Sequence, residues 1–124
     1  MPGKQPAFPF VIDRLLPVQP VVRPMFGCHA VYAGDKIVLV LRNREDHMEA
    51  NGVWVATKRE FHDSLKKDLP SLKSVYLLSD GSSETNWQMI PLESDSFEEE
   101  VIRACELILE GDVRIGNVPK RKRK

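Results

Sequence analysis

The chain contains 124 residues, of which 42% are hydrophobic, and this composition argues for a single folded domain rather than a disordered chain. Of its 18 basic side chains, five fall in the last six residues, which contain no acidic residue. The rest of the chain has 13 basic and 18 acidic residues, so a body with a net charge of −5 precedes a tail with a net charge of +5. Because no apolar run exceeds five residues and the first ten residues lack the apolar centre of a signal peptide, we expect a cytoplasmic protein with no membrane segment.

The N-terminal part predicts a short helix followed by an extended connector. Residues 1–8 are expected to form a flexible lead, and residues 10–16 have an apolar spacing that suits two helical turns, which Pro17 ends. Residues 17–24 contain three prolines and three valines. Because proline fixes its own backbone and favours an extended predecessor, this stretch predicts a stiff connector.

A hairpin is predicted next along the chain. Residues 28–33 and 36–42 are apolar and rich in β-branched side chains, and the Gly34-Asp35 pair between them suits a two-residue turn. The charged segment 42–52 is too polar to pack and predicts a mobile loop. Residues 53–56 then predict a short third strand.

Two helices with capping motifs are predicted in the second half. Thr57 and Glu60 have the spacing of a capping box, and apolar side chains recur at the fourth and eighth positions after Phe61 until Pro70 ends the helix. The last helix is indicated by an apolar pattern with the helical period over residues 97–109. It begins at a second capping box, Ser96 to Glu99, and Gly111 suits its C-cap.

Two further strands, over 75–78 and 87–90, complete the predicted fold. It is a single α+β domain with a mostly antiparallel sheet of about five strands packed with two main helices. We expect the domain to cover residues 9–112, after the lead over 1–8, and to be followed by a disordered basic tail over 113–124.

Metal and thiol chemistry are not indicated. The three histidines, His29, His47 and His62, share no spacing typical of metal ligands. Cys28 and Cys105 are expected to be two reduced, packed thiols. Because neighbours on a strand point to opposite faces, Cys28 and His29 are not expected to form a thiolate–imidazole pair.

Other catalytic patterns are also missing. The chain has no nucleophile elbow, no P-loop and no dinucleotide-binding glycine motif. The turn over 80–84 offers groups that would suit a cation or a phosphate, but an ordinary turn explains the same residues. Glutamates 98–100 fit the dipole of the last helix better than acid–base catalysis. We therefore expect a protein that is not an enzyme and needs no cofactor or metal.

The two tryptophans are better explained by core packing. Trp54 and Trp87 stand on predicted strands with apolar neighbours, whereas a stacking platform for nucleic acid would place them on an exposed face.

The C-terminal tail is a candidate binding segment. Five consecutive cations would attract nucleic acid or an acidic protein partner: Lys120, Arg121, Lys122, Arg123 and Lys124. The same run also suits a solvated, solubilising extension or a segment that folds back on the acidic body.

A family resemblance arises at residues 23–27, Arg-Pro-Met-Phe-Gly, and the hairpin that follows. This region resembles the N-terminal domain of TfoX (Sxy) proteins, a family related to MmcQ/YjbR-like domains. The likeness covers roughly residues 14–112 and implies a bacterial α+β domain associated with regulators of competence gene expression. It brings no catalytic residues and gives Met25, Phe26 and Gly27 a structural role.

Three hypotheses follow. The first is a non-catalytic, TfoX-N-like interaction module that acts near nucleic acid or a transcription complex. The alternative is a small-molecule-binding domain or an enzyme with a cleft near Cys28, His29 and the 43–51 loop, with converging side chains and a strongly shifted pKa. A homodimer formed through an open sheet edge or an apolar face is a third hypothesis.

Overall fold

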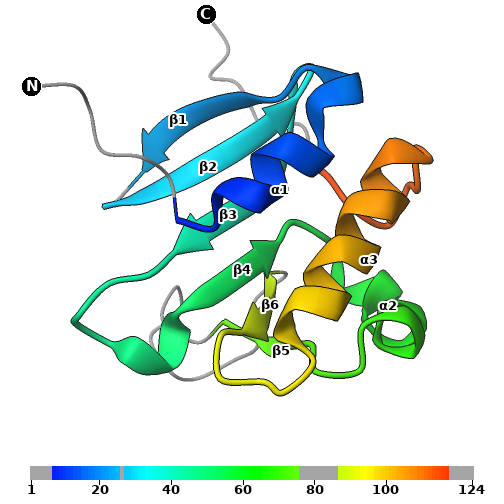
Figure 1. Ribbon diagram of the computed structural model, residues 1–124. Helices are drawn as coiled ribbons and strands as arrows, with labels where there is room; N and C mark the ends of the chain where they lie inside the picture. The colour runs from blue at the N-terminus through cyan, green and yellow to red at the C-terminus, as the bar shows by residue number, and fades with distance from the viewer. Residues whose placement is uncertain (1–6, 26, 76–86, 118–124) are drawn as a thin grey trace, which may run out of the picture.

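The computed structural model describes residues 7–25, 27–75 and 87–117. Within these residues, six strands form one antiparallel sheet in the order β1-β2-β3-β4-β6-β5 (Figure 1). The strands are β1 (Val21–Met25), β2 (Cys28–Ala33), β3 (Lys36–Arg42), β4 (Gly52–Val55), β5 (Lys73–Ser74) and β6 (Gln88–Pro91). The helices are α1 (Pro9–Arg14), α2 (His62–Asp68) and α3 (Phe97–Leu109), with short 3-10 turns η1 (Leu16–Val18), η2 (Met48–Ala50) and η3 (Arg59–Phe61). The predicted single α+β domain is confirmed.

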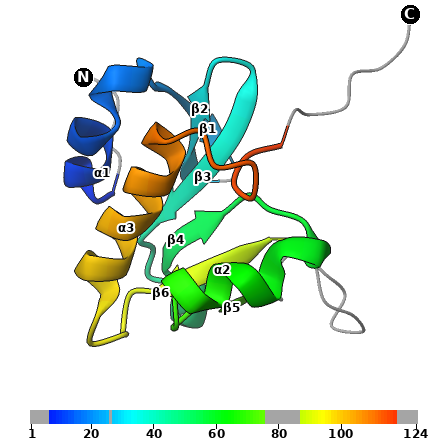
Figure 2. The ribbon, with the colours of Figure 1, turned by 90° about the vertical axis from the view of Figure 1, so that its right-hand side faces the viewer.

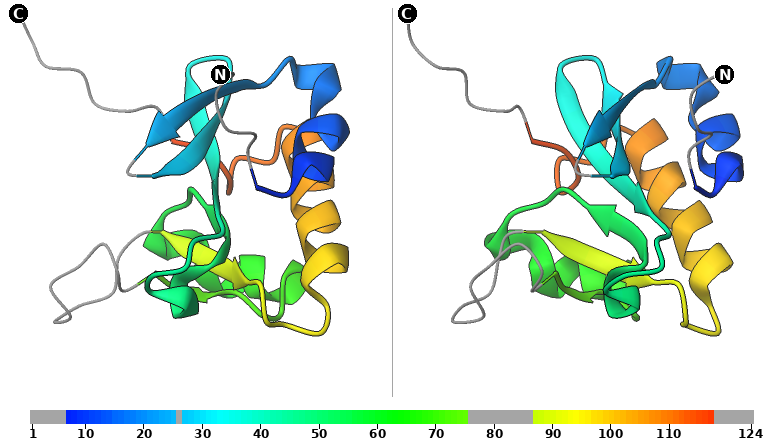
Figure 3. Two further views of the ribbon diagram at one scale, coloured as in Figure 1. Left: turned by 60° about the vertical axis from the view of Figure 1, so that its left-hand side comes forward. Right: turned by 90° about the vertical axis from the view of Figure 1, so that its left-hand side faces the viewer.

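Helices α1 and α3 lie side by side on one face of the sheet (Figures 1 and 3). The alternation of strand side chains creates two apolar layers, one on each face. On β4, Val53 and Val55 join the main core with α1 and α3, whereas Trp54 points into a second cluster that contains Val40 and Met89. Both clusters are buried, so the sheet is covered on both sides.

The predicted extended connector over 17–24 is extended only in its second half, residues 21–24, which belongs to the sheet. It forms η1 and then strand β1, which pairs Val22 with Val31 and Arg23 with Ala30. Pro24 is compatible with this strand because β1 is at the edge of the sheet, where a residue without an N–H leaves the ladder intact. The sixth strand therefore comes from a proline-rich stretch.

Neither predicted capping box forms. Thr57 is buried at the end of β4, its hydroxyl has no hydrogen-bond partner in the described residues, and the helix begins only after η3. The Ser96 hydroxyl turns inward and donates to the carboxylate of Glu100 instead of capping α3. Packing against the body has overridden the local capping pattern at both sites.

The predicted end of α3 is confirmed. Gly111 has a φ of +77°, which glycine adopts without strain. Its N–H donates to the Ile108 carbonyl at 3.0 Å, and the Asp112 N–H donates to the Leu107 carbonyl at 3.0 Å. These two bonds form a Schellman motif.

The strand predicted over 75–78 is placed only in part. Strand β5 pairs with β6 through Lys73 and Ser74, and the Val75 N–H donates to the Trp87 carbonyl at 3.2 Å. Residues 76–78 and the turn over 80–84 lie outside the described residues.

The C-terminal boundary predicted at residue 112 is wrong, because residues 112–117, here called the C-terminal strap, pack on the domain. Ile115 is 3% exposed. Asn117 and Ile37 exchange two backbone hydrogen bonds of 2.9 and 3.0 Å, and the Gly116 N–H donates to the Ala56 carbonyl at 2.7 Å. The strap therefore forms one antiparallel bridge with the start of β3 and a backbone hydrogen bond to the residue after β4; Figure 2 shows it beside these strands.

Four charged side chains hold the strap against α2 and α3. The Arg114 guanidinium lies 2.7 Å from Asp112 and 3.0 Å from Asp68, and Arg103 of α3 lies 3.0 Å from the other oxygen of Asp68. The hydrogen bonds from these arginines hold the pKa of both aspartates below their usual range.

The lead predicted over residues 1–8 also contributes packing at its end. The Phe8 ring lies 5.1 Å from the Phe97 ring, centroid to centroid, which joins the start of α1 to the start of α3. Residues 1–6 lie outside the described residues.

Candidate functional site

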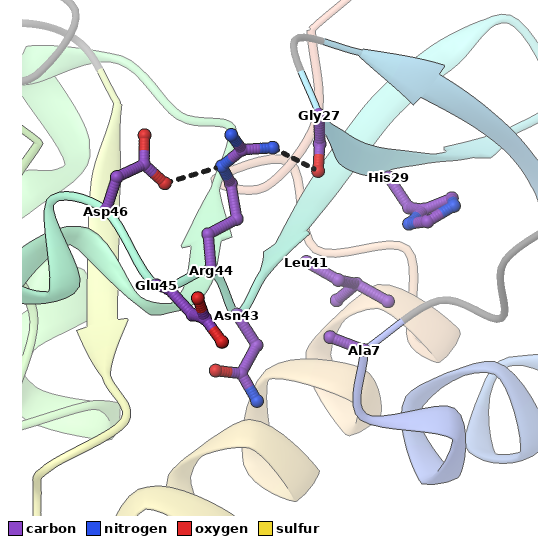
Figure 4. A pocket seen from close by; sticks show the side chains of 8 residues that line it. All are labelled: Ala7, Gly27, His29, Leu41, Asn43, Arg44, Glu45 and Asp46. Atoms are coloured by element: carbon purple, nitrogen blue, oxygen red, sulfur yellow. Dashed lines mark hydrogen bonds and ion pairs between the residues drawn. The ribbon is translucent and has the colours of Figure 1, made fainter.

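A pocket of about 660 Å³ lies on the helix side of the sheet, where β2 and β3 meet the segment after β3 (Figure 4). Its volume falls in the range of pockets that hold small-molecule ligands. The residues that line it are Ala7, Gly27, His29, Leu41, Asn43, Arg44, Glu45 and Asp46. The floor is apolar at Ala7 and Leu41, and the rim is polar.

A buried arginine organises the loop that forms the polar wall. Arg42 ends β3 and is 3% exposed. Its guanidinium donates to the Asn51 side-chain oxygen at 2.7 Å, to the His47 carbonyl at 2.9 Å and to the Asp46 carbonyl at 3.0 Å. A buried guanidinium needs such partners, and here the loop wraps around it to supply them.

Asn51 fastens the same loop from its other end. Its side-chain oxygen accepts the Arg44 N–H at 2.9 Å, and its side-chain nitrogen donates to the Arg44 carbonyl at 2.9 Å. Asn51 itself is buried. The loop that the sequence predicts to be mobile is therefore built around two buried polar side chains.

Arg44 crosses the mouth of the pocket. Its Nε donates to Asp46 at 2.8 Å, and its Nη1 donates to the Gly27 carbonyl at 3.3 Å (Figure 4). The hydrogen bond from Arg44 lowers the pKa of the Asp46 carboxyl. This contact links the β3–β4 loop to the turn between β1 and β2.

Gly27 makes that contact possible. Its φ is +79°, and a Cβ at this position would lie 1.9 Å from Nη1 of Arg44. Of the three residues that the family resemblance gives a structural role, Met25 ends β1 and Gly27 forms the turn, and Phe26 lies outside the described residues.

Cys28 and His29 point to opposite faces, as the strand pattern predicts. His29 is half-buried and lines the pocket, whereas Cys28 is buried in the second apolar cluster with Ala30 and Trp54. Burial raises the pKa of the Cys28 thiol, and the nearby Arg42 guanidinium only partly offsets that rise. The cleft of the alternative hypothesis thus includes His29 but not Cys28.

The remaining thiol and histidines lie apart from the pocket. Burial raises the pKa of Cys105 to about 12, and neither cysteine forms a disulfide, which confirms two reduced, packed thiols. His62 is buried at the start of α2, and exposed His47 lies 3.7 Å from Glu49. No group of three or more metal-binding side chains occurs in the described part of the chain.

Trp54 is a core residue, as predicted. It is 3% exposed, its indole N–H donates to the Ala50 carbonyl at 2.9 Å, and its ring lies 6.2 Å from that of half-buried Trp87. Neither ring forms an open stacking platform.

The glutamates of α3 divide into two kinds. Glu98 and Glu99 are exposed in the first turn, whereas Glu100 is buried. The Glu100 carboxylate accepts the Ser71 N–H at 2.9 Å and the Ser71 hydroxyl at 2.6 Å, besides the Ser96 hydroxyl. Glu100 therefore ties α3 to the turn before β5.

The basic tail residues Lys120 to Lys124 lie outside the described residues. The organising pair of the pocket, Arg42 and Asn51, was not singled out from the sequence. The available signal was an arginine at the end of an apolar strand, followed by an Asn-Gly pair before the next strand.

Comparison with protein-family models, with curated proteins and with solved structures gives no match for this chain. In addition, no helix within the described ranges is both long enough and apolar enough to cross a membrane.

Proposed function

We propose that the protein is a non-catalytic interaction module, similar in plan to the TfoX N-terminal domains, that acts in the cytoplasm near nucleic acid or a transcription complex. The observation that supports this proposal is the pocket beside the β3–β4 loop. Its polar wall is pre-ordered by Arg42 and Asn51, and a pre-ordered wall lowers the entropy cost of binding a partner.

The lining of the pocket suits a short extended peptide segment of a partner protein. Arg44 offers donors, Glu45 offers acceptors and Asn43 offers both, which matches the N–H and C=O groups of an extended backbone. An apolar side chain of the peptide would fill the floor at Leu41 and Ala7. Both charge signs occur on the rim, so the pocket has no strong preference for an anion.

Binding is favoured over catalysis by the chemistry of the nearest nucleophile. Cys28 faces away from the pocket, and its raised pKa keeps the thiol protonated at neutral pH. A thiolate nucleophile would need the opposite shift and an open position beside His29.

A peptide-display selection on the whole protein, followed by amide NMR spectra, tests the proposal. We expect selected peptides to shift the signals of residues 27–29 and 41–46, and Asn43→Ala or Glu45→Ala to weaken their binding about tenfold. Glu49→Ala, in the same loop but outside the pocket lining, is the matched control and should leave affinity within about twofold. Selected peptides that shift signals elsewhere, or equal losses with the control, would contradict this site.

The volume and apolar floor of the pocket also favour a second function, which is small-molecule binding or an enzyme activity at the same place. Fragments titrated into the same labelled protein distinguish the two. Saturable fragment shifts at His29 and Leu41 with no selectable peptide would favour the small-molecule function.

The tail supports a further part of the proposal, in which its five uninterrupted cations bind nucleic acid or an acidic partner. Deletion of residues 118–124 should remove that binding, and unchanged binding after deletion would contradict it. A homodimer through the β1 edge or an apolar face is tested by sedimentation at several protein concentrations. The mass of a single chain at every concentration would exclude the homodimer in that range.

A further inference from the structure

The polar side chains of the pocket rim divide between two sides of the loop after β3. In Figure 4 the Arg44 guanidinium points toward Gly27 and Asp46. The Glu45 carboxylate and the Asn43 carboxamide point away from that guanidinium. All five residues line the pocket. One side of the loop therefore carries an ion pair, and the other side presents side-chain oxygen atoms to a ligand.

The two arginines of the rim share one anionic partner. The Arg44 Nε lies 2.8 Å from a carboxylate oxygen of Asp46. The Arg42 guanidinium is buried and lies 3.5 Å from the same oxygen. Because Arg42 also donates to two backbone carbonyls and to Asn51, its hydrogen-bonding groups are directed into the loop and not into the pocket. Asp46 therefore balances positive charge that the loop itself contains.

Glu45 has no such partner. Within the described residues its carboxylate takes part in no ion pair and accepts no hydrogen bond, and the side chain of Asn43 makes no hydrogen bond. Beside these two exposed side chains lies the apolar floor, formed by Ala7 and buried Leu41. A carboxylate at the edge of an apolar floor matches a side chain that has an aliphatic stem and a cationic end.

We propose that the pocket selects a lysine or arginine side chain of the bound peptide, and that Glu45 determines this specificity. The inference rests on the proposed peptide-binding function and names the side chain that enters the pocket. Its methylene stem covers Leu41 and Ala7. Its cationic end donates to the Glu45 carboxylate and to the side-chain oxygen of Asn43, which makes charge-assisted hydrogen bonds. An acidic side chain would be repelled by Glu45, and an uncharged aliphatic one would leave both acceptors without a donor.

Titration of amino-acid derivatives into the labelled full chain, followed by amide NMR spectra, tests this preference. The probes are the N-acetyl methylamides of lysine, arginine, norleucine and glutamate, which share their backbone groups and differ in the side chain. Because an ion pair in contact with water contributes modestly, we expect the two cationic probes to bind about threefold to fivefold more tightly than the norleucine probe and to shift the signals of residues 41–46. The glutamate probe should bind more weakly than norleucine.

Two results of this titration would overturn the inference. One is a norleucine probe that binds as tightly as the cationic probes. The other is the absence of any saturable shift over residues 41–46 when the cationic probes are raised to about 10 mM, since a pocket of this specificity should hold its side chain at millimolar concentration.

A pair of charge-removing variants assigns the preference to one residue. Glu45→Gln keeps the shape of the side chain and should remove the advantage of the lysine probe over norleucine. Because Glu45 is exposed and holds no other side chain, we expect the fold to tolerate this change. Glu49→Gln is the matched control, since it removes the same charge from an exposed residue of the same loop outside the pocket lining, and it should leave the advantage within about twofold. Equal losses in both variants would overturn the role of Glu45.

The peptides from the display selection separate this inference from the function on which it rests. If the selected peptides shift the pocket signals but have no lysine or arginine at a fixed position, the peptide-binding function stands and this inference fails. If the cationic probes bind through Glu45 and no peptide is selected, the specificity of the pocket stands and the peptide-binding function fails.

Discussion

Replacing Asn51 with alanine should loosen the wall of the pocket and destabilise the domain. The substitution removes three hydrogen bonds, one from the buried Arg42 guanidinium at 2.7 Å and two with the Arg44 backbone at 2.9 Å each. It also removes part of the acceptor set that makes burial of the Arg42 charge tolerable.

The magnitude follows from those three bonds. A hydrogen bond to a charged group contributes about 1.5 to 3 kcal/mol, and each bond to the backbone contributes about 1 kcal/mol. Arg42 keeps its bonds to the His47 and Asp46 carbonyls, and water can reach the partly exposed backbone of Arg44. We therefore expect Asn51→Ala to lower the free energy of unfolding by about 2 to 4 kcal/mol.

Urea unfolding and amide hydrogen exchange check this value. Asn43→Ala is the matched control, because Asn43 is an exposed asparagine of the same loop with no side-chain bond in the described residues, and it should change stability by less than about 0.5 kcal/mol. The Arg44 amide should lose protection in Asn51→Ala and keep it in Asn43→Ala. Equal stability of the two variants, or a protected Arg44 amide in both, would refute the role assigned to Asn51.

Three further predictions concern backbone strain, acid stability and thiol reactivity. Gly52→Ala should lower the free energy of unfolding by more than about 3 kcal/mol or prevent folding, because φ is +145° and the new Cβ would lie 2.1 Å from a carbonyl oxygen of β6. Gly34→Ala, which lies in open space at φ +65°, should lower it by only about 1 kcal/mol. Thermal unfolding followed by circular dichroism compares the two variants, and similar midpoints would contradict the steric argument. Hydrogen bonds from two arginines lower the pKa of Asp68 below its ordinary 3.8, so its contribution to stability is present at higher pH and is lost as pH falls through 3.8 and below. Asp68→Asn should therefore flatten the fall of the free energy of unfolding between about pH 5 and 2. Urea titrations at several pH values measure this fall, and the same fall in both proteins would count against the ion pairs of Asp68. Cys28 and Cys105 should react slowly with a thiol reagent at pH 8 and rapidly in urea, since burial raises both pKa values, and fast reaction of the native chain would show that the thiols are exposed.

Helices and strands could be predicted where the apolar side chains follow the helical or the strand period clearly. Strands β2 and β3 follow from β-branched residues around Gly34-Asp35, and α3 follows from its 3.6-residue period and from Gly111. Strand β1 was not predicted as a strand because prolines argue against a central strand, and only the position at the sheet edge makes them acceptable. Edge position is a property of the whole sheet that a local pattern does not contain.

The candidate site was predictable only in part. Alternation along β2 predicts that His29 and Cys28 diverge, and the structure confirms it. The pocket wall was not predictable, because it depends on whether Arg42 finds acceptors nine residues away at Asn51. The same holds for Ser96, whose hydroxyl was expected at the helix cap and instead binds a buried carboxylate. In each case a tertiary partner decides between two local arrangements.

Charge-rich segments of this chain become ordered where a guanidinium finds enough oxygen acceptors. Arg42 orders the loop over 43–51, and Arg114 fastens the strap over 112–117, although composition assigned both segments to the mobile part of the chain. Once these arginines are satisfied, the polar side chains left exposed beside them are the ones available to a partner. At the pocket these side chains are Asn43 and Glu45, which is why the peptide-binding experiment substitutes them and leaves the arginines in place.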